Sequence, residues 1–106
     1  MENNEFKQLL KNHGTKGRQF AQISDIENKA VLGCSAKQYK ANKGIKATAN
    51  TRDHLTQSQN ASLRMIEIHS SDKIERDNAT TGEQCKTTVS KVSNVIANTL
   101  LELDKI

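Results

Sequence analysis

Apolar residues in this chain recur mainly at three- and four-residue spacings, the pattern of amphipathic helices. The clearest stripe lies near the C-terminal end and consists of Cys85, Val89, Val92, Ile96, Leu100 and Leu103. Such a stripe predicts a helix packed against a core; the alternative, a coiled-coil seam, would have to persist over more heptads. Sustained alternation of apolar and polar residues, the mark of a half-buried strand, is missing. The pattern therefore predicts an all-α protein, a compact single domain of about five helices over residues 1–106.

Glycines and capping residues set the expected ends of the first helices, because the chain has no proline. Asn4 is placed to cap a first helix that ends before Gly14. Ser24 and Glu27 have the spacing of a capping box, which predicts that a second helix begins there and stops at Gly33.

Shorter elements are expected in the middle of the chain. Ser35 predicts the start of a short helix that Gly44 closes, and residues 45–50 read as irregular. Thr51 is the next expected cap, leading into residues 52–55.

A longer helix is expected from about Asn60. Its apolar residues fall on more than one face, which predicts a central and mostly buried element: Leu63, Met65, Ile66 and Ile68. Residues 70–72 are expected to interrupt this helix before Ile74 resumes it. Thr80 and Glu83 repeat the spacing of a capping box and are expected to open the last helix.

Composition points to a thin aliphatic core. Only 34% of the residues are hydrophobic, and the aromatic residues are two Phe and one Tyr. The two cysteines, Cys34 and Cys85, form no CxxC pair, so two reduced thiols are expected, with Cys85 in the core. The chain has no long apolar run and no signal-peptide pattern, which predicts a soluble cytoplasmic protein.

Positive charge is concentrated in the first half. Residues 1–52 contain ten Lys and Arg against four Asp and Glu, whereas residues 53–106 contain six against eight. Between residues 28 and 52 there are six basic residues and no acidic one. A segment of this kind predicts contact with a polyanion or an acidic protein surface, although a merely solvated basic face is the plain alternative.

The residues expected to make this contact belong to the basic segment or to the loop before the second helix. The favoured ones are Lys37, Lys40, Lys43, Lys46 and Arg52, with Lys16 and Arg18 as a secondary extension. Lysines of this kind contact phosphates rather than bases, so the binding does not depend on sequence. Tyr39 lies within the segment and is placed either to stack on a base or, slightly favoured, to close the edge of a small core.

Catalytic and metal-binding patterns are not found. His13, His54 and His69 share no i, i+4 spacing, and the chain has no HExxH, GxSxG or phosphate-binding glycine motif. His13 precedes a helix-ending glycine, a position where an imidazole interacts favourably with the helix dipole and can act as a structural cap. We therefore expect a non-enzymatic protein without cofactor or metal, and keep a hydrolase using His13 or His54 only as an outside alternative.

Four short motifs occur in an order that resembles a known family. They are Asn12-His13-Gly14, Ala41-Asn42-Lys43-Gly44-Ile45, Arg52-Asp53-His54-Leu55 and Lys73-Ile74-Glu75-Arg76-Asp77. In this order they resemble the C-terminal module of the DNA-damage-inducible protein D family, which is related to phage antirepressor and Bro-type proteins. The resemblance runs from about Phe6 to Leu103.

The resemblance implies a role in the bacterial damage (SOS) response. Members of that family are associated with recombinase filaments on single-stranded DNA, and no catalytic residues are established for them. The motif residues would then be structural: Asn12, His13, Gly14, Gly44, Asp53, His54, Arg76 and Asp77.

Two functions are therefore expected for this chain. The first is a small binding module that acts on DNA or on a DNA-bound protein complex, without sequence specificity and with a homodimer as an option. The second is a phage- or mobile-element-encoded inhibitor that binds a host defence or regulatory protein directly. Salt separates the two, because phosphate binding weakens steeply with salt and an apolar protein contact does not.

Overall fold

The computed structural model describes the backbone of residues 2–106 and the side chains of residues 5–106. The described chain is all-α, as predicted, and its five α-helices and one 3₁₀ helix (η1) follow in this order: α1 (Glu2–Asn12), α2 (Arg18–Leu32), α3 (Ala36–Lys43), η1 (Thr51–His54), α4 (Gln57–Asp77) and α5 (Gly82–Asp104). Within residues 2–106, no helix has both the length and the apolar character needed to cross a bilayer.

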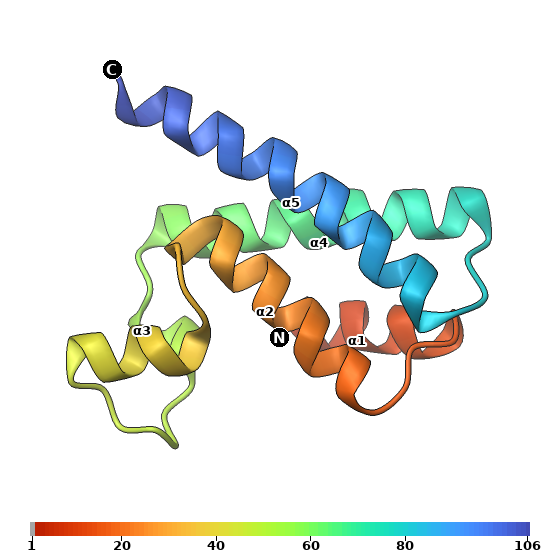
Figure 1. Ribbon diagram of the computed structural model, residues 1–106, viewed down its shortest axis with the longest axis horizontal. Coiled ribbons are helices and arrows are strands. Elements are labelled where there is room, and N and C mark those ends of the chain that lie inside the picture. Colours follow the sequence, from red (N-terminus) through yellow and green to blue (C-terminus); the bar gives the residue numbers. More distant parts are fainter. Residues whose placement is uncertain (1) are drawn as a thin grey trace.

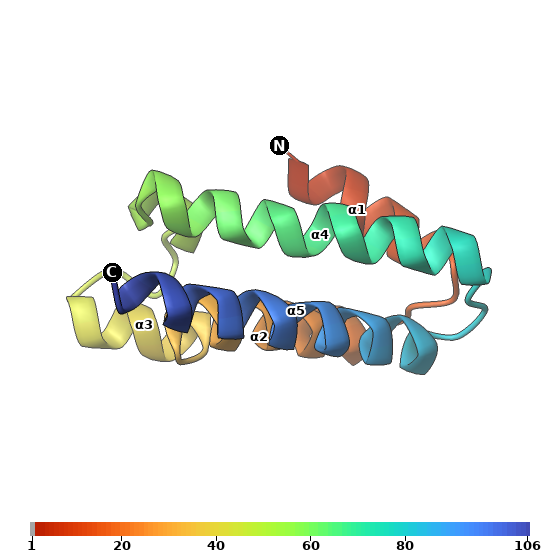
Figure 2. The same ribbon diagram turned by 90° about the horizontal axis from the view of Figure 1, so that it is seen from above.

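The helices form two layers. Figure 2 shows α1 and α4 in one layer and α2, α3 and α5 in the other. α2 and α5 run side by side in the same direction, and α4 crosses them (Figure 1). The C-terminal end of α5 projects past the start of α4 and is covered by no other element in this view.

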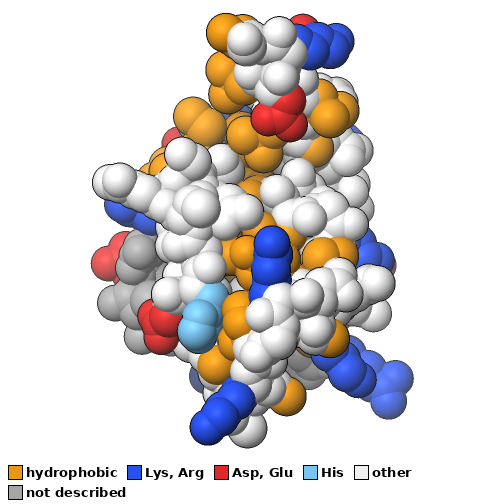
Figure 3. Space-filling view, turned by 90° about the vertical axis from the view of Figure 1, so that its left-hand side faces the viewer, with side chains coloured by type: hydrophobic (Ala, Val, Ile, Leu, Met, Phe, Trp, Pro, Cys, Tyr) orange, Lys and Arg blue, Asp and Glu red, His pale blue; other side chains and the backbone are white. Residues whose placement is uncertain are grey.

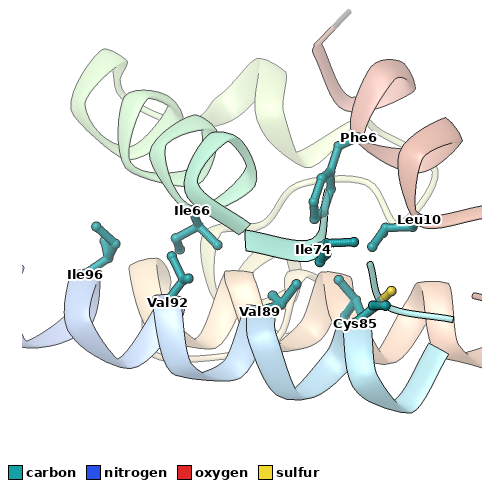
Figure 4. Packing of buried hydrophobic residues seen from close by; sticks show 10 residues of the cluster. Phe6, Leu10, Ile66, Ile74, Cys85, Val89, Val92 and Ile96 are labelled. Atoms are coloured by element: carbon teal, nitrogen blue, oxygen red, sulfur yellow. The ribbon is translucent and has the colours of Figure 1, made fainter. Parts of the chain in front are cut away.

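The core lies between the layers and is aliphatic, as the composition predicted. Its main residues come from four helices and are Phe6, Leu10, Ile23, Ile66, Ile74, Cys85, Val89, Val92 and Ile96 (Figure 4). The stripe predicted for the last helix is confirmed from Cys85 to Ile96. Leu100 packs against the cluster at its edge, whereas Leu103 is 56% exposed because α5 has left the bundle by that point.

The first two predicted helix starts are wrong. α1 already begins at Glu2, so Asn4 lies inside the helix and does not cap it. α2 begins at Arg18 after Gly17, and Ser24 and Glu27 lie in its middle. Despite their capping-box spacing, these two residues do not cap the helix, and Glu27 instead turns inward and is only 4% exposed.

α4 is one continuous helix, and the interruption expected at residues 70–72 is wrong. Ser71 Oγ donates to the Glu67 carbonyl oxygen at 2.7 Å, a bond that keeps the hydroxyl satisfied within the helix. Ser70 is fully buried. Only one face of the helix is buried, so Met65 and Ile68, expected in a central element, are 49% and 53% exposed.

Most helix ends follow the predicted chemistry, with shifts of a few residues. Three predicted ends hold: Gly33 and Gly44 end α2 and α3 in the left-handed conformation, and the Ser35 hydroxyl accepts from the Gln38 N–H. Three predicted starts move: the η1 cap is Asn50 rather than Thr51, α4 begins after Thr56 rather than at Asn60, and the box that opens α5 is Thr81–Gln84 rather than Thr80–Glu83.

Gly14 allows the loop after α1 to approach the loop before α5. Its φ is +97°, and a Cβ atom there would lie 2.1 Å from the Thr80 carbonyl oxygen. Beside it, His13 Nδ1 lies 2.8 Å from the Ala79 carbonyl oxygen. The two loops are thereby held together, which closes the bundle at this end.

Candidate functional site

The basic segment folds into a lobe at one end of the molecule, which we call the α3 lobe (residues 36–54). It consists of α3, the irregular residues 44–50 and η1, and Figure 1 shows it at the left beyond the end of α2. The capping hydroxyl of Ser35 and the left-handed Gly44 fix the two ends of α3. The lobe therefore presents its lysines from a short, well-capped helix and the loop that follows.

Three of the favoured contact residues lie on the outside of the lobe. Lys37, Lys43 and Lys46 are exposed. Among the side chains that the structure describes, no carboxylate lies within ion-pair distance of any of the three. Their charges are therefore not neutralised within the molecule and are open to an external anion.

Lys40 is used within the lobe. Its ammonium group donates to the carbonyl oxygens of Ala47 and Ala49, at 2.8 and 3.1 Å, and ties the loop back onto α3. Two of its three donors are thereby occupied by neutral acceptors. Lys40 still contributes a positive charge to the lobe, but as a structural brace rather than a mobile phosphate contact.

Tyr39 is half-buried, and Lys43 Nζ lies 5.8 Å from the centre of its ring. This distance suits a cation–π contact. A base that stacked on the ring would compete with Lys43 for its face. The geometry thus favours the structural alternative for Tyr39, in which the ring covers the edge of the lobe.

Arg52 is largely buried, unlike the exposed Lys37, Lys43 and Lys46. One of its guanidinium nitrogens lies 2.5 Å from Glu67 Oε2, and the Arg52 and Glu67 side chains are 17% and 5% exposed. Asn60 Nδ2 also donates to the Arg52 carbonyl oxygen at 3.0 Å. Arg52 therefore anchors η1 to α4, and the structure does not place it with Lys37, Lys43 and Lys46.

Glu27 of α2 joins this anchor and forms a buried polar cluster with Glu67 and Arg52. Burial first, and then the negative charge of Glu67 with its hydrogen bond, raise the pKa of Glu27 well above its usual value, and Arg52 opposes this only in part. The cluster connects three elements: α2, η1 and α4. Sequence reasoning missed it, although one signal was available, because Glu67 interrupts the apolar spacing between Leu63 and Ile74.

Lys16 and Arg18 do not extend the basic surface of the lobe. Both are exposed, but they lie at the start of α2, whereas α3 follows its end. A helix of 15 residues separates them, about 22 Å at 1.5 Å per residue. Figure 3, which looks onto the end of the molecule formed by the α3 lobe, shows Lys and Arg side chains projecting singly among uncharged ones rather than as a dense patch.

The motif residues of the resemblance are dispersed over the fold. Asn12 accepts from Gln8 on α1, and Arg76 makes two hydrogen bonds to the adjacent Asp77 at the exposed end of α4. Asp53 and His54 are exposed on η1, whereas His13 directly follows α1. Figure 1 shows the segment of η1 and the end of α1 at opposite ends of the molecule.

The two histidines of the hydrolase alternative are therefore not brought together. His69 is exposed on α4, and Cys34 and Cys85 are both free thiols, half-buried and buried respectively. Across the described part of the chain, no three His, Cys, Asp or Glu side chains are grouped as a metal site would require.

Compared with known proteins, the sequence matches no protein-family model and no curated protein. The kinship with the DNA-damage-inducible protein D family stays a prediction based on the four short motifs.

Proposed function

We propose that this protein is a non-catalytic binding module whose α3 lobe contacts a polyanion, in the first place nucleic acid, alone or within a protein–DNA complex. The observation that supports the proposal is the set of exposed lysines on the lobe, Lys37, Lys43 and Lys46, which lack a carboxylate partner among the described side chains. The buried ion pair between Arg52 and Glu67 holds this lobe on the helix bundle.

Contacts of this type predict binding without sequence specificity. Lysine ammonium groups neutralise phosphates and release counterions, which makes affinity fall steeply with salt. The single arginine of the lobe, Arg52, is engaged by Glu67 and is therefore not available for a bidentate contact with a guanine edge. The link to recombinase filaments and the damage response rests on the sequence resemblance alone.

The test is fluorescence-anisotropy titration of a labelled single strand and a matched duplex, at about 50 and 200 mM salt, the range in which phosphate-driven affinity collapses. The variant removes the three exposed charges together, as Lys37→Ala, Lys43→Ala and Lys46→Ala. Each lost phosphate contact should reduce the slope of log K against log salt by about 0.9 for a duplex.

A matched control removes the same charge elsewhere, as Lys7→Ala, Lys11→Ala and Lys16→Ala on α1 and the loop after it. Both variants lower the net charge of the chain equally, so a site on the lobe predicts a large loss only in the first. Equal losses would contradict a localised site. Absence of binding at low salt would refute nucleic-acid contact and favour the second function, direct binding of a host protein.

A further inference from the structure

A second concave surface lies between α4 and α5, away from the α3 lobe. The groove has a volume of about 490 Å³, and its apolar lining consists of buried Val92 and Ile96 with exposed Met65 and Val95 beside them. Its rim is mainly basic and includes Lys73, Arg76 and Lys91. Arg76 is held by Asp77, so Lys73 and Lys91 are the rim cations without an ion-pair partner among the described side chains.

The end of α5 next to this groove is itself apolar and uncovered. Val95, Leu101, Leu103 and Ile106 are 64%, 61%, 56% and 102% exposed. A second hollow runs along this end and is lined by residues that include Val95, Leu101 and Glu102. Because Val95 lines both hollows, the groove and the uncovered helix end form one continuous surface.

We propose that this surface is occupied by a second copy of the chain, in a two-fold symmetric dimer in which the α5 helices pack antiparallel. The same molecule carries both a groove with an apolar lining and basic side chains at its rim, and a projecting helix end that bears apolar and acidic side chains. A two-fold axis requires such a self-complementary surface, since each copy offers both parts to the other.

The register of the dimer follows from the charges. An axis placed between Ile96 and Ala97 sets Glu102 of each copy opposite Lys91 of the other, and this pair forms twice. It also lays the projecting end, residues 98–106, along the stretch of α5 that borders the groove. Val95 then lies near the centre of the contact, where water is excluded and residues contribute most to binding.

One internal contact competes with this arrangement and is easily given up. Glu102 lies 3.2 Å from Lys105 of its own helix, and both side chains are about 70% exposed. Exposed pairs of this kind contribute little to stability. Little stability is therefore lost when Glu102 pairs with Lys91 of the second copy instead of with Lys105 of its own helix. The new pair places Glu102 beside an apolar contact instead of in open solvent.

The test is sedimentation velocity of the full chain without nucleic acid, from about 5 to 500 µM, which covers the dissociation constants expected of a small and partly polar interface. We expect a concentration-dependent shift from monomer to dimer. Val95→Glu should raise the dissociation constant at least about tenfold, because it buries a charge at the centre of the contact. Ile68→Glu is the matched control, since Ile68 is also an aliphatic residue that is more than half exposed, on α4 and outside the groove.

The charge pair gives a second readout that does not depend on apolar packing. Lys91→Glu or Glu102→Lys alone should weaken the dimer several-fold, and the two changes together should restore it, because the pair is reformed with its signs exchanged. A chain that stays monomeric throughout the range overturns the proposal. So does a double reversal that fails to restore the dimer. Neither result bears on binding through the α3 lobe, which is measured separately.

Discussion

Replacing Arg52 by leucine should destabilise the protein strongly, because it leaves Glu67 and Glu27 buried without a cation. Glu67 and Glu27 are each only 4% exposed, and Arg52 is the ion-pair partner of Glu67. Removal of one partner from a buried pair costs about 3–5 kcal/mol. Because the Arg52 side chain is still 17% exposed, we expect a loss at the lower end of this range, about 3 kcal/mol.

That loss is large for a chain of this size. A protein of 106 residues has an unfolding free energy of about 5–15 kcal/mol. Urea unfolding followed by far-ultraviolet circular dichroism measures the difference directly. With a slope of about 1.5 kcal/mol/M, a loss of 3 kcal/mol moves the midpoint by about 2 M.

A double-mutant cycle with Glu67→Gln identifies the cause. If the loss comes from the uncompensated charge of Glu67, Arg52→Leu should cost clearly less when Glu67 is already Gln, because the ion pair is then absent before Arg52 is replaced. A loss below about 1 kcal/mol in the wild-type background would refute the reasoning, since it would mean that the cluster behaves as an exposed ion pair.

Three further outcomes follow from single sites. Burial and the charge of Glu67 raise the pKa of Glu27, so the folded state holds the proton of this carboxyl group more tightly than the unfolded state does. The stability that this proton contributes is complete below the pKa of the unfolded state and is lost as the pH rises through the raised pKa of the folded state. Glu27→Gln should remove this decline in stability, which urea unfolding at several pH values measures. Gly14→Ala should cost more than about 1 kcal/mol in the same assay, because the new Cβ meets the Thr80 carbonyl oxygen in a left-handed conformation. A thiol reagent should label half-buried Cys34 well before Cys85, which is fully buried.

The helical architecture could be predicted because its signals are local. Cys85, Val89, Val92 and Ile96 lie at helical spacing and do form the buried face of α5. Gly33 and Gly44 end their helices because only glycine adopts the left-handed conformation at little cost. Each of these features depends on residues that are neighbours in the sequence.

Two of the predictions that failed depended on contacts between distant residues. Ser24 and Glu27 have the spacing of a cap, but Glu27 lies in the middle of α2 and is buried beside Glu67 and Arg52, which belong to other elements. The sequence predicts Arg52 as an exposed cation, because its partner Glu67 is fifteen residues away in the sequence. Neither partner can be found from local spacing, so the buried cluster emerges only when α2, η1 and α4 are packed together.

The position of Arg52 also affects how binding by the α3 lobe should be judged. Arg52 is committed to Glu67, so its loss would weaken nucleic-acid binding only by loosening the lobe that carries Lys37, Lys43 and Lys46. A residue that touches phosphate lowers the salt slope when it is removed, whereas a positioning residue lowers affinity and leaves the slope unchanged. The Arg52→Leu variant, titrated at several salt concentrations, should therefore show weaker binding with the wild-type slope. A reduced slope would place Arg52 on the phosphates and would contradict its role as a buried anchor.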